Sequence, residues 1–311
     1  YTRVFREVKG LGRELGRLGG EIPGSRVKAR AAILVDWDNW WALEYSAGPS
    51  CDLKYLDEVQ RYYDAFYKKN IPVDVISVTD SLDGYLLVAA PVLYMVKEGC
   101  SEKIERFVKE GGYFVTTFFS GIVDEHDLVQ TGGYPGKLKD VLGIWVEETD
   151  ALPRGAKNSF KWNGRTYECE LLCDILYTRN AQALAFYEKD FYAGAPVLTK
   201  NRYGSGSAYY AASRGDADFY ADFVGEVAKE AGLEPLWEEI PGVEVCARQK
   251  EDRYFLFFLN HGDAEAKVRA LTDGESLLEN RWYRAGELFE IPAKGVVILK
   301  VLKIHLDRPM G

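Results

Sequence analysis

The sequence predicts an α/β domain with a mostly parallel sheet, followed by a small all-β domain. Up to residue 118, apolar strand-like runs alternate with amphipathic helical segments, and after Pro235 the helical patterns stop. Alternating strands and helices are typical of a parallel sheet covered by helices on both faces. Short strands separated by regularly spaced turns are typical of an all-β module. The length of 311 residues fits two domains, at roughly 150 residues each.

The α/β domain is predicted from four strands and two helices. The strands are residues 31–35, 73–78, 85–90 and 113–118, and the helices are residues 54–69 and 101–110. The first helix has one apolar side, formed by Tyr55, Leu56, Val59, Tyr62, Tyr63 and Phe66. The second is expected to begin with Ser101 as its N-cap and to end at Gly111-Gly112.

Between residues 145 and 215 the pattern changes to short strands of antiparallel type. Residues 195–199 and 208–212 flank Gly204-Ser205-Gly206, which predicts a tight hairpin rather than a phosphate-binding loop. Asp216 is expected to cap a helix that ends at Gly232. Its buried face would be Phe219, Tyr220, Phe223, Val224, Val227 and Ala228. About five strands are expected in the last domain, at residues 243–247, 253–259, 267–271, 287–291 and 296–301.

The first residues form a helical pattern that is weak by itself. Its apolar face is Val4, Val8, Leu11, Leu15 and Leu18, interrupted by Gly10, Gly12 and Gly16. Each glycine costs about 1 kcal/mol relative to alanine inside a helix, so we expect this helix to need a partner surface. The chain also begins at Tyr1, without an initiator methionine. We therefore expect a fragment of a longer protein.

Composition excludes several classes of partner. The chain has 39 Lys+Arg against 48 Asp+Glu, a net charge of −9, which argues against binding to nucleic-acid phosphates or to a cytoplasmic membrane surface. No apolar run approaches the ~20 residues of a membrane span. The sequence has five cysteines and opens without a signal-peptide pattern, so we expect a reduced, cytoplasmic protein. Aromatic residues make up 14% of the chain, a surplus that often serves interfaces or sugar-stacking surfaces.

The strongest candidate site follows the first predicted strand, at Asp36-Trp37-Asp38-Asn39-Trp40-Trp41. Ligands of open α/β sheets gather at the carboxyl ends of the strands. Three tryptophans beside two carboxylates could line a sugar subsite, or they could pack one domain or subunit against another. We favour the interface role, although both can hold at once. The predicted interface or sugar-subsite rim is Asp36, Trp37, Trp40 and Trp41.

Two other groups have the residue types of metal ligands. Asp124-Glu125-His126-Asp127 is a run of four adjacent residues, which seldom converge on one ion, so a solvated loop is expected. Cys169 and Cys173 are four residues apart, a spacing that on a helix would put both on one face, but no second Cys or His pair lies nearby in sequence. We expect buried, reduced thiols there. The sequence therefore predicts no metal site and no cofactor site.

Several stretches resemble the glycoside hydrolase family 42 β-galactosidases. The run Arg30–Glu44 is similar to the start of that family's middle domain. Further similar stretches are Tyr62–Phe66, Ala89–Tyr94, Phe118–Glu125, Asp190–Gly194 and the Gly204–Gly206 hairpin. The resemblance covers nearly the whole chain, and its stretches occur in the family's order.

The resemblance implies a domain plan. In that family a catalytic (β/α)8 barrel precedes a trimerisation domain similar to class I glutamine amidotransferases, with a flavodoxin-like sheet, and a C-terminal β domain follows. Residues 1–25 would then be the last barrel helix and a linker. Residues 26–238 would be the trimerisation domain and 239–303 the β domain. The tail, residues 304–311, has no interpretation. The implied partners are copies of the chain in a homotrimer, the missing barrel, and a β-galactoside bound by the parent enzyme, but no nucleic acid and no membrane.

The chemistry that the resemblance implies lies outside this chain. Retaining glycosidases need two carboxyl groups about 5–5.5 Å apart, which this family carries on the barrel, with the acid/base in an Asn-Glu dipeptide. The sequence contains no Asn-Glu dipeptide, so no residue inherits that role. We expect the non-catalytic part of a β-galactosidase that hydrolyses terminal β-galactosides with retention. The alternative is an autonomous assembly or carbohydrate-binding protein without chemistry of its own.

A third possibility is a hydrolase that uses Ser120. Ser120-Gly121 follows the fourth strand, about where the related amidotransferases hold a nucleophile. Phe118-Phe119-Ser120-Gly121-Ile122 lacks the first glycine of a nucleophile elbow, and His126 is the one histidine close by in sequence that could serve as a base. We therefore expect Ser120 to have no catalytic role.

Overall fold

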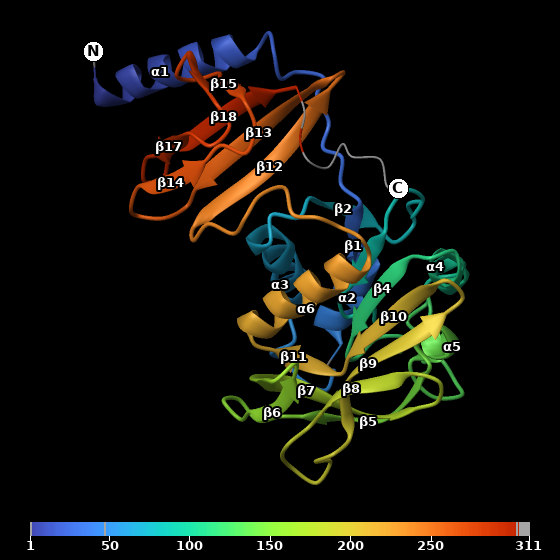
Figure 1. Cartoon of the computed structure of the whole chain (residues 1–311). Coiled ribbons are helices and arrows are strands. Elements are labelled where there is room, and N and C mark those ends of the chain that lie inside the picture. Colours follow the sequence, from blue (N-terminus) through green and yellow to red (C-terminus); the bar gives the residue numbers. More distant parts are fainter. Residues whose placement is uncertain (1, 47, 303, 305–311) are drawn as a thin grey trace. The chain divides into compact units, whose positions relative to one another are not determined.

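The computed structural model describes residues 2–46, 48–302 and 304 and divides into two compact units (Figure 1). The α/β unit comprises Arg30–Phe66 and Val73–Leu233. The second unit, called here the β unit, comprises Tyr1–Ala29, Tyr67–Pro72 and Glu234–Gly311. The predicted order, an α/β domain and then an all-β domain, is confirmed. Among the described residues, no helix has the length and apolar character needed to cross a membrane.

A seven-stranded sheet forms the centre of the α/β unit, in the order β2-β1-β3-β4-β10-β9-β8. The first five strands pair in parallel, and β9 and β8 continue antiparallel at one edge. Their bounds are β1 Ala31–Val35, β2 Val73–Ser77, β3 Leu87–Ala90, β4 Tyr113–Thr117, β8 Gln182–Phe186, β9 Pro196–Tyr203 and β10 Gly206–Ala211. The predicted mostly parallel sheet is therefore present. Strand β3 begins at Leu87 rather than at residue 85.

Three of the helices of this unit lie where the sequence predicts them. The helices are α2 Trp37–Tyr45, α3 Tyr55–Lys68, α4 Cys100–Lys109, α5 Lys139–Leu142 and α6 Ala217–Glu230, with the short 3-10 helix η1 at Gly136–Leu138. In α6 the predictions are confirmed: Asp216 accepts the backbone N–H of Phe219 at 2.8 Å, and the whole predicted face is buried. Helices α2 and α5 were not predicted.

Two predictions about helices are wrong. Leu56 and Tyr63 of α3 are exposed, because the side of the helix that faces the core carries Glu58 and Ala65 instead. Ser101 does not cap α4: the helix starts one residue earlier, after Gly99 with φ +75°, and the Ser101 hydroxyl bonds to Glu102.

A second, antiparallel sheet in the order β11-β7-β5, with β6 on β7, belongs to the same unit. Its strands are β5 Ile144–Ala151, β6 Asn158–Trp162, β7 Arg165–Thr178 and β11 Ser213–Gly215. The predicted antiparallel pattern is confirmed, but β7 is 14 residues long rather than short. The predicted hairpin joins β9 to β10. A Cβ atom at Gly206 would lie 2.1 Å from the carbonyl oxygen of Gly112, so only glycine fits there.

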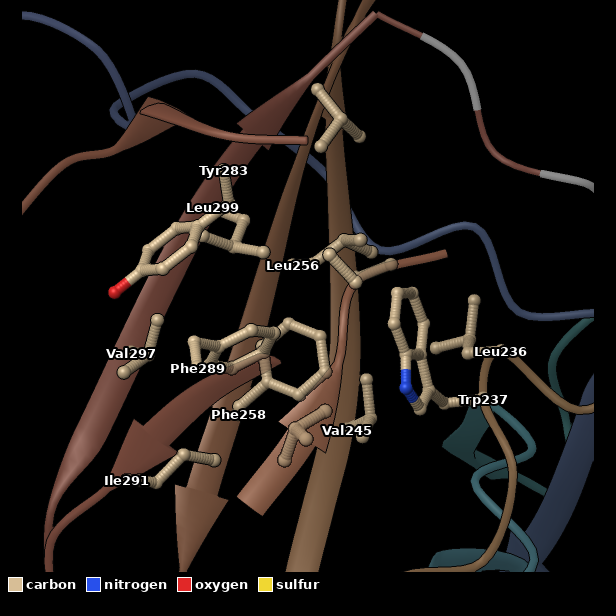
Figure 2. Close-up of a cluster of buried hydrophobic side chains, with 14 of the residues drawn as sticks. Leu236, Trp237, Val245, Leu256, Phe258, Tyr283, Phe289, Ile291, Val297 and Leu299 are labelled. Atoms are coloured by element: carbon tan, nitrogen blue, oxygen red, sulfur yellow. The ribbon is translucent and has the colours of Figure 1, made fainter. Parts of the chain in front are cut away.

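The β unit is built from helix α1 and seven strands. These are α1 Arg3–Leu18, β12 Val243–Lys250, β13 Arg253–Asn260, β14 Ala266–Arg269, β15 Gly274–Ser276, β16 Arg281–Tyr283, β17 Leu288–Ile291 and β18 Val296–Val301. Figure 2 shows its core, where the ring of Phe258 packs edge-to-face against Trp237 and against Phe289, with ring centroids 5.0 Å apart in both pairs. The five predicted strands are present, and the three-residue strands β15 and β16 were missed.

Helix α1 contacts the rest of the β unit at its C-terminal end. Leu18 and Ile22 pack against the buried cluster around Phe255 and Ile298. Arg17 donates to the carbonyl of Leu278 at 3.0 Å, and the carboxylate of Glu21 pairs with Lys300 at 3.0 Å. The remaining apolar positions of the predicted face are exposed; they are Val4, Val8, Leu11 and Leu15. The predicted helix is thus confirmed, and most of its apolar face is open to solvent.

Candidate functional site

The aromatic run predicted as a site forms helix α2, which starts where β1 ends. The carboxylate of Asp36 accepts the backbone N–H of Asn39 at 3.4 Å and so caps the helix. Asn39 is fully buried and ties α2 to the end of β3, since its amide donates to the carbonyl of Val92 and accepts from the N–H of Met95. The run is therefore a helix anchored to the carboxyl edge of the sheet.

Three aromatic side chains line the outer side of α2. Trp37 is 63% exposed, Trp41 51% and Tyr45 88%, at successive intervals of four residues; we call these three residues the α2 stripe. The ring centroids of Trp37 and Trp41 are 6.3 Å apart. Trp40 is half-buried and its indole N–H donates to Glu44 at 2.6 Å. Tyr45 was missed by the sequence reasoning, although its spacing from Trp41 repeats that of Trp41 from Trp37.

Asp36 is buried and paired rather than free. The ammonium of Lys97 donates to Asp36 at 2.8 Å and to Asp38 at 2.6 Å. Partial burial alone would lower the pKa of Lys97, but the hydrogen bonds from the two carboxylates outweigh it and raise that pKa. The lysine therefore stays charged, and Asp36 serves as a helix cap and an ion-pair partner.

Strained backbone marks the carboxyl ends of the next two strands. Val92, after β3, has φ +46°, and Phe119, after β4, has φ +57°. Such values are costly for a side chain with a Cβ, above all a β-branched one, and they persist only where the surroundings enforce them. The N–H of Val92 donates to the Thr117 hydroxyl at 2.8 Å. The N–H of Phe119 donates to Asp174 at 3.0 Å.

Ser120 is a structural hydroxyl in this network. It is buried, accepts the N–H of Leu93 at 2.9 Å and lies 2.9 Å from the Thr116 hydroxyl. Among the hydrogen bonds of the described residues, none joins Ser120 to a histidine, and His126 lies in an exposed loop. A nucleophilic serine needs an adjacent base, which this arrangement does not supply.

Asp174 is the buried carboxylate that braces the strained end of β4. It lies in β7 and accepts hydrogen bonds from the Thr149 hydroxyl at 2.6 Å, the Tyr210 hydroxyl at 2.5 Å and the N–H of Phe119. Burial raises its pKa, and these three donors offset part of that rise. The sequence reasoning missed Asp174, although an acidic residue inside the apolar run 171–176 was a visible sign of it.

The remaining candidates lie in a turn and on a buried strand. In the 124–127 run, the Asp124 carboxylate accepts the N–H groups of Leu128 and His126, which lower its pKa, and so closes a turn. Within residues 2–46, 48–302 and 304, no three side chains of metal-binding type gather in one place. Cys169 and Cys173 are buried free thiols, and they lie on strand β7 rather than on a helix.

Sequence comparisons place the chain among known domains. The model of the β-galactosidase trimerisation domain matches residues 29–234, and that of the β-galactosidase C-terminal domain matches residues 242–300. A β-galactosidase of Planococcus sp. (strain L4) is 48% identical over 305 residues, which cover 96% of this chain and 45% of that protein. One from Geobacillus kaustophilus is 40% identical over 301 residues, covering 96% of this chain and 44% of that protein.

Solved structures of β-galactosidases are also similar to this chain. The crystal structure of a β-galactosidase from Bacillus circulans sp. alkalophilus superposes with a TM-score of 0.93 at 47% identity, over 96% of this chain and 45% of that one. A family 42 β-galactosidase, Gan42B, superposes with a TM-score of 0.92 at 34% identity, over 97% and 44%. The chain thus spans less than half the length of each of these four relatives.

Proposed function

Because the chain belongs to the glycoside hydrolase family 42 β-galactosidases, we propose that it is their non-catalytic portion, the trimerisation domain with the C-terminal domain. The parent protein would hydrolyse terminal non-reducing β-galactosides with retention. The observation that carries this proposal is the ordered match of both domains within about 45% of each relative's length. The catalytic carboxyl pair would lie on a barrel that is not part of this chain.

We propose residues 26–238 as the trimerisation domain, 239–303 as the C-terminal domain, and 1–25 as the last barrel helix and linker. The exposed apolar face of α1 supports the last assignment, since a barrel would cover it. We also propose that the central sheet has the flavodoxin-like fold of the glutamine amidotransferases. The order of its parallel strands, β2-β1-β3-β4-β10, supports this. When these five strands are numbered along the chain, their order is 2-1-3-4-5, which is the order of flavodoxin-like sheets.

We propose that the predicted site serves self-association: the α2 stripe would form a subunit contact in a homotrimer located in the cytoplasm. Trp37 and Trp41, with Trp40 beside them and Asp36 as the cap that fixes the helix, would form a subunit contact, the rim of a neighbouring sugar subsite, or both. Large exposed aromatic patches on a protein surface usually mark contacts, and a stable contact buries about 800 Å² per partner. The five free cysteines suit a reducing compartment.

Two measurements test the proposal. The purified 311-residue chain should not hydrolyse a chromogenic β-galactoside above background; turnover abolished by changing one of its own carboxylates would refute the non-catalytic assignment. Light scattering over a concentration series should show a trimer that Trp37→Ala/Trp41→Ala weakens and Trp282→Ala, an exposed tryptophan of β16, does not. A wild-type chain that is monomeric at all concentrations would refute the proposed self-association.

A further inference from the structure

A second pair of exposed aromatic rings lies on the sheet of β5 and β7, in the α/β unit. Trp145 and Tyr177 are direct cross-strand partners. Their ring centroids are 6.2 Å apart with the planes tilted by 32°. Trp145 is 44% exposed and Tyr177 53%. Glu147 also faces outward from β5 and accepts a hydrogen bond from the Tyr177 hydroxyl at 2.7 Å. We call Trp145, Glu147 and Tyr177 the β5–β7 platform.

Each member of the platform is held in place. The edge of the Trp145 indole lies against Gly133, where a Cβ atom would come within 2.3 Å of the indole nitrogen and where φ is +85°. On the opposite side of β5 and β7, the neighbouring residues Ile144, Val146 and Leu176 are buried and anchor both strands. A break in strand register between Val146 and Glu148 leaves Glu147 free to turn toward Tyr177. A ligand would therefore meet a surface that is already ordered, which lowers the entropic cost of binding.

The chemistry of the platform suits a neutral polyol. The two rings offer apolar faces, and the carboxylate beside them accepts hydrogen bonds from hydroxyl groups. The hydrogen bond to Glu147 raises the pKa of Tyr177, so the phenol remains a neutral donor. Glu148 follows directly, and the chain carries a net charge of −9, which together disfavour an anionic ligand.

A β-galactopyranose ring matches these groups. Its axial 4-hydroxyl leaves the C3, C4 and C5 hydrogens on one face, which gives a continuous apolar patch that can stack on an indole. Its hydroxyl groups then lie at the ring edge, within reach of a carboxylate next to the indole. The negative charge around the platform disfavours a nucleotide or a phosphorylated sugar.

We propose that the β5–β7 platform is a non-catalytic binding site for neutral β-galactosides, with Trp145 as the stacking ring and Glu147 as the hydroxyl acceptor. The choice of galactose over other neutral sugars rests on the proposed function. The site would hold the parent enzyme near its substrate without taking part in bond cleavage. It is separate from the α2 stripe, which lies on a helix and in which the rings of Trp37 and Trp41 are neighbours.

Titration of the 311-residue chain with methyl β-galactoside and lactose, followed by the backbone N–H signals of residues 145, 147 and 177 in NMR, tests the site, because these signals remain in every variant. We expect saturable shifts of these signals, and Trp145→Ala or Glu147→Gln should weaken binding by about tenfold or more, a loss of ~1.4 kcal/mol. Trp145→Phe keeps an apolar ring and should bind with intermediate affinity. Trp282→Ala is the matched control, because it removes an exposed tryptophan of β16 and should bind like wild type.

Three outcomes would overturn the proposal. One is the absence of saturable binding by the folded wild-type chain. Another is unchanged affinity in Trp145→Ala and Glu147→Gln with circular dichroism like that of wild type. The third is a Trp145→Ala/Tyr177→Ala variant that loses self-association, which would make the surface a subunit contact. None of these outcomes depends on turnover, so failure of the sugar-binding proposal leaves the non-catalytic assignment standing.

Discussion

A buried ion pair provides the sharpest test of how the α/β unit is stabilised. Glu58 of α3 is 1% exposed, Arg214 of β11 is 8% exposed, and their charged groups are in direct contact. Burial raises the pKa of Glu58, and the nearby guanidinium groups of Arg214 and Arg61 offset part of that rise. The hydroxyls of Tyr62 and Tyr220 are also buried there and have no hydrogen-bond partner among the described residues. Arg214 is therefore the main group that opposes the effect of burial on the Glu58 carboxyl.

Arg214→Met removes that counter-charge, and we expect Glu58 to become protonated in the folded state. At pH 7, protonating a carboxyl with an unfolded pKa of about 4.3 costs about 3.7 kcal/mol, at about 1.36 kcal/mol per pH unit. At pH 5 the same step costs about 1 kcal/mol. A carboxyl whose folded pKa is raised favours the folded state at low pH, and this advantage is lost as the pH rises above the unfolded pKa. The stability that Arg214→Met loses relative to wild type should therefore be smaller at pH 5 than at pH 7, by at most about 2.7 kcal/mol, which is the difference between the two protonation costs.

Urea unfolding at pH 7 and pH 5, followed by tryptophan fluorescence, measures these differences. Glu58→Met/Arg214→Met removes both charges, so it should recover most of the loss, because well-packed apolar replacements of buried ion pairs are often neutral or stabilising. Lys157→Met is the matched control: its pair with Glu168 is exposed, and such pairs contribute little to stability. Equal deficits of Arg214→Met at both pH values, or a double variant as unstable as the single one, would refute the reasoning.

Three further predictions concern single side chains of the α/β unit, each checked by urea unfolding against wild type. Asp216→Ala should lower the free energy of unfolding by about 1–2 kcal/mol, because it removes the cap of α6 and an acceptor for the N–H of Glu168. Ser101→Ala removes no cap and should change the free energy of unfolding by less than about 0.5 kcal/mol. Equal losses in the two variants would contradict the capping argument. Ser120→Ala should lower the free energy of unfolding by about 1–3 kcal/mol, because it leaves the buried N–H of Leu93 without its acceptor. It should leave the turnover of the parent enzyme unchanged, and a folded variant without turnover would restore a catalytic role for Ser120. Asp174→Asn should lower the free energy of unfolding by about 3 kcal/mol, because an amide offers one acceptor oxygen to a site that holds three donors. A loss below about 1 kcal/mol would show that the carboxylate does not brace Phe119.

Helices and strands that are determined by residues close together in the sequence could be predicted. Helix α6 carries its cap, its apolar face and its terminating glycine within 17 residues, Asp216 to Gly232, and all three were predicted. Strand β1 is a short, fully apolar run, and the hairpin of β9 and β10 is defined by its turn glycines. In each case the residues that determine the structure are neighbours in sequence.

Helices and strands that depend on contacts with residues far away in the sequence could not be predicted. Strands β15 and β16 have three residues each, too few to show alternation, and β15 is held by pairing with β18. Helix α2 has nine residues with aromatic side chains on several sides, so it lacks a clear apolar face, and its anchor is the contact of Asn39 with residues 92 and 95. Ser101 resembles a cap by residue type, but the conformation of Gly99 decides where α4 begins.

The carboxyl edge of the sheet shows how strained, catalytic-looking geometry can serve structure alone. Val92 and Phe119 adopt backbone conformations that are common at active sites, yet the N–H groups around them are already used by Thr117, Ser120 and Asp174. An oxyanion site needs N–H groups that point at a substrate, and here those hydrogen bonds are made internally. Phe119 and Asp174 are 55 residues apart in sequence, so the strain and its compensation become visible only in the folded chain. The same bracing positions α2 through Asn39 and Val92, and the edge therefore acts as a rigid base for the α2 stripe.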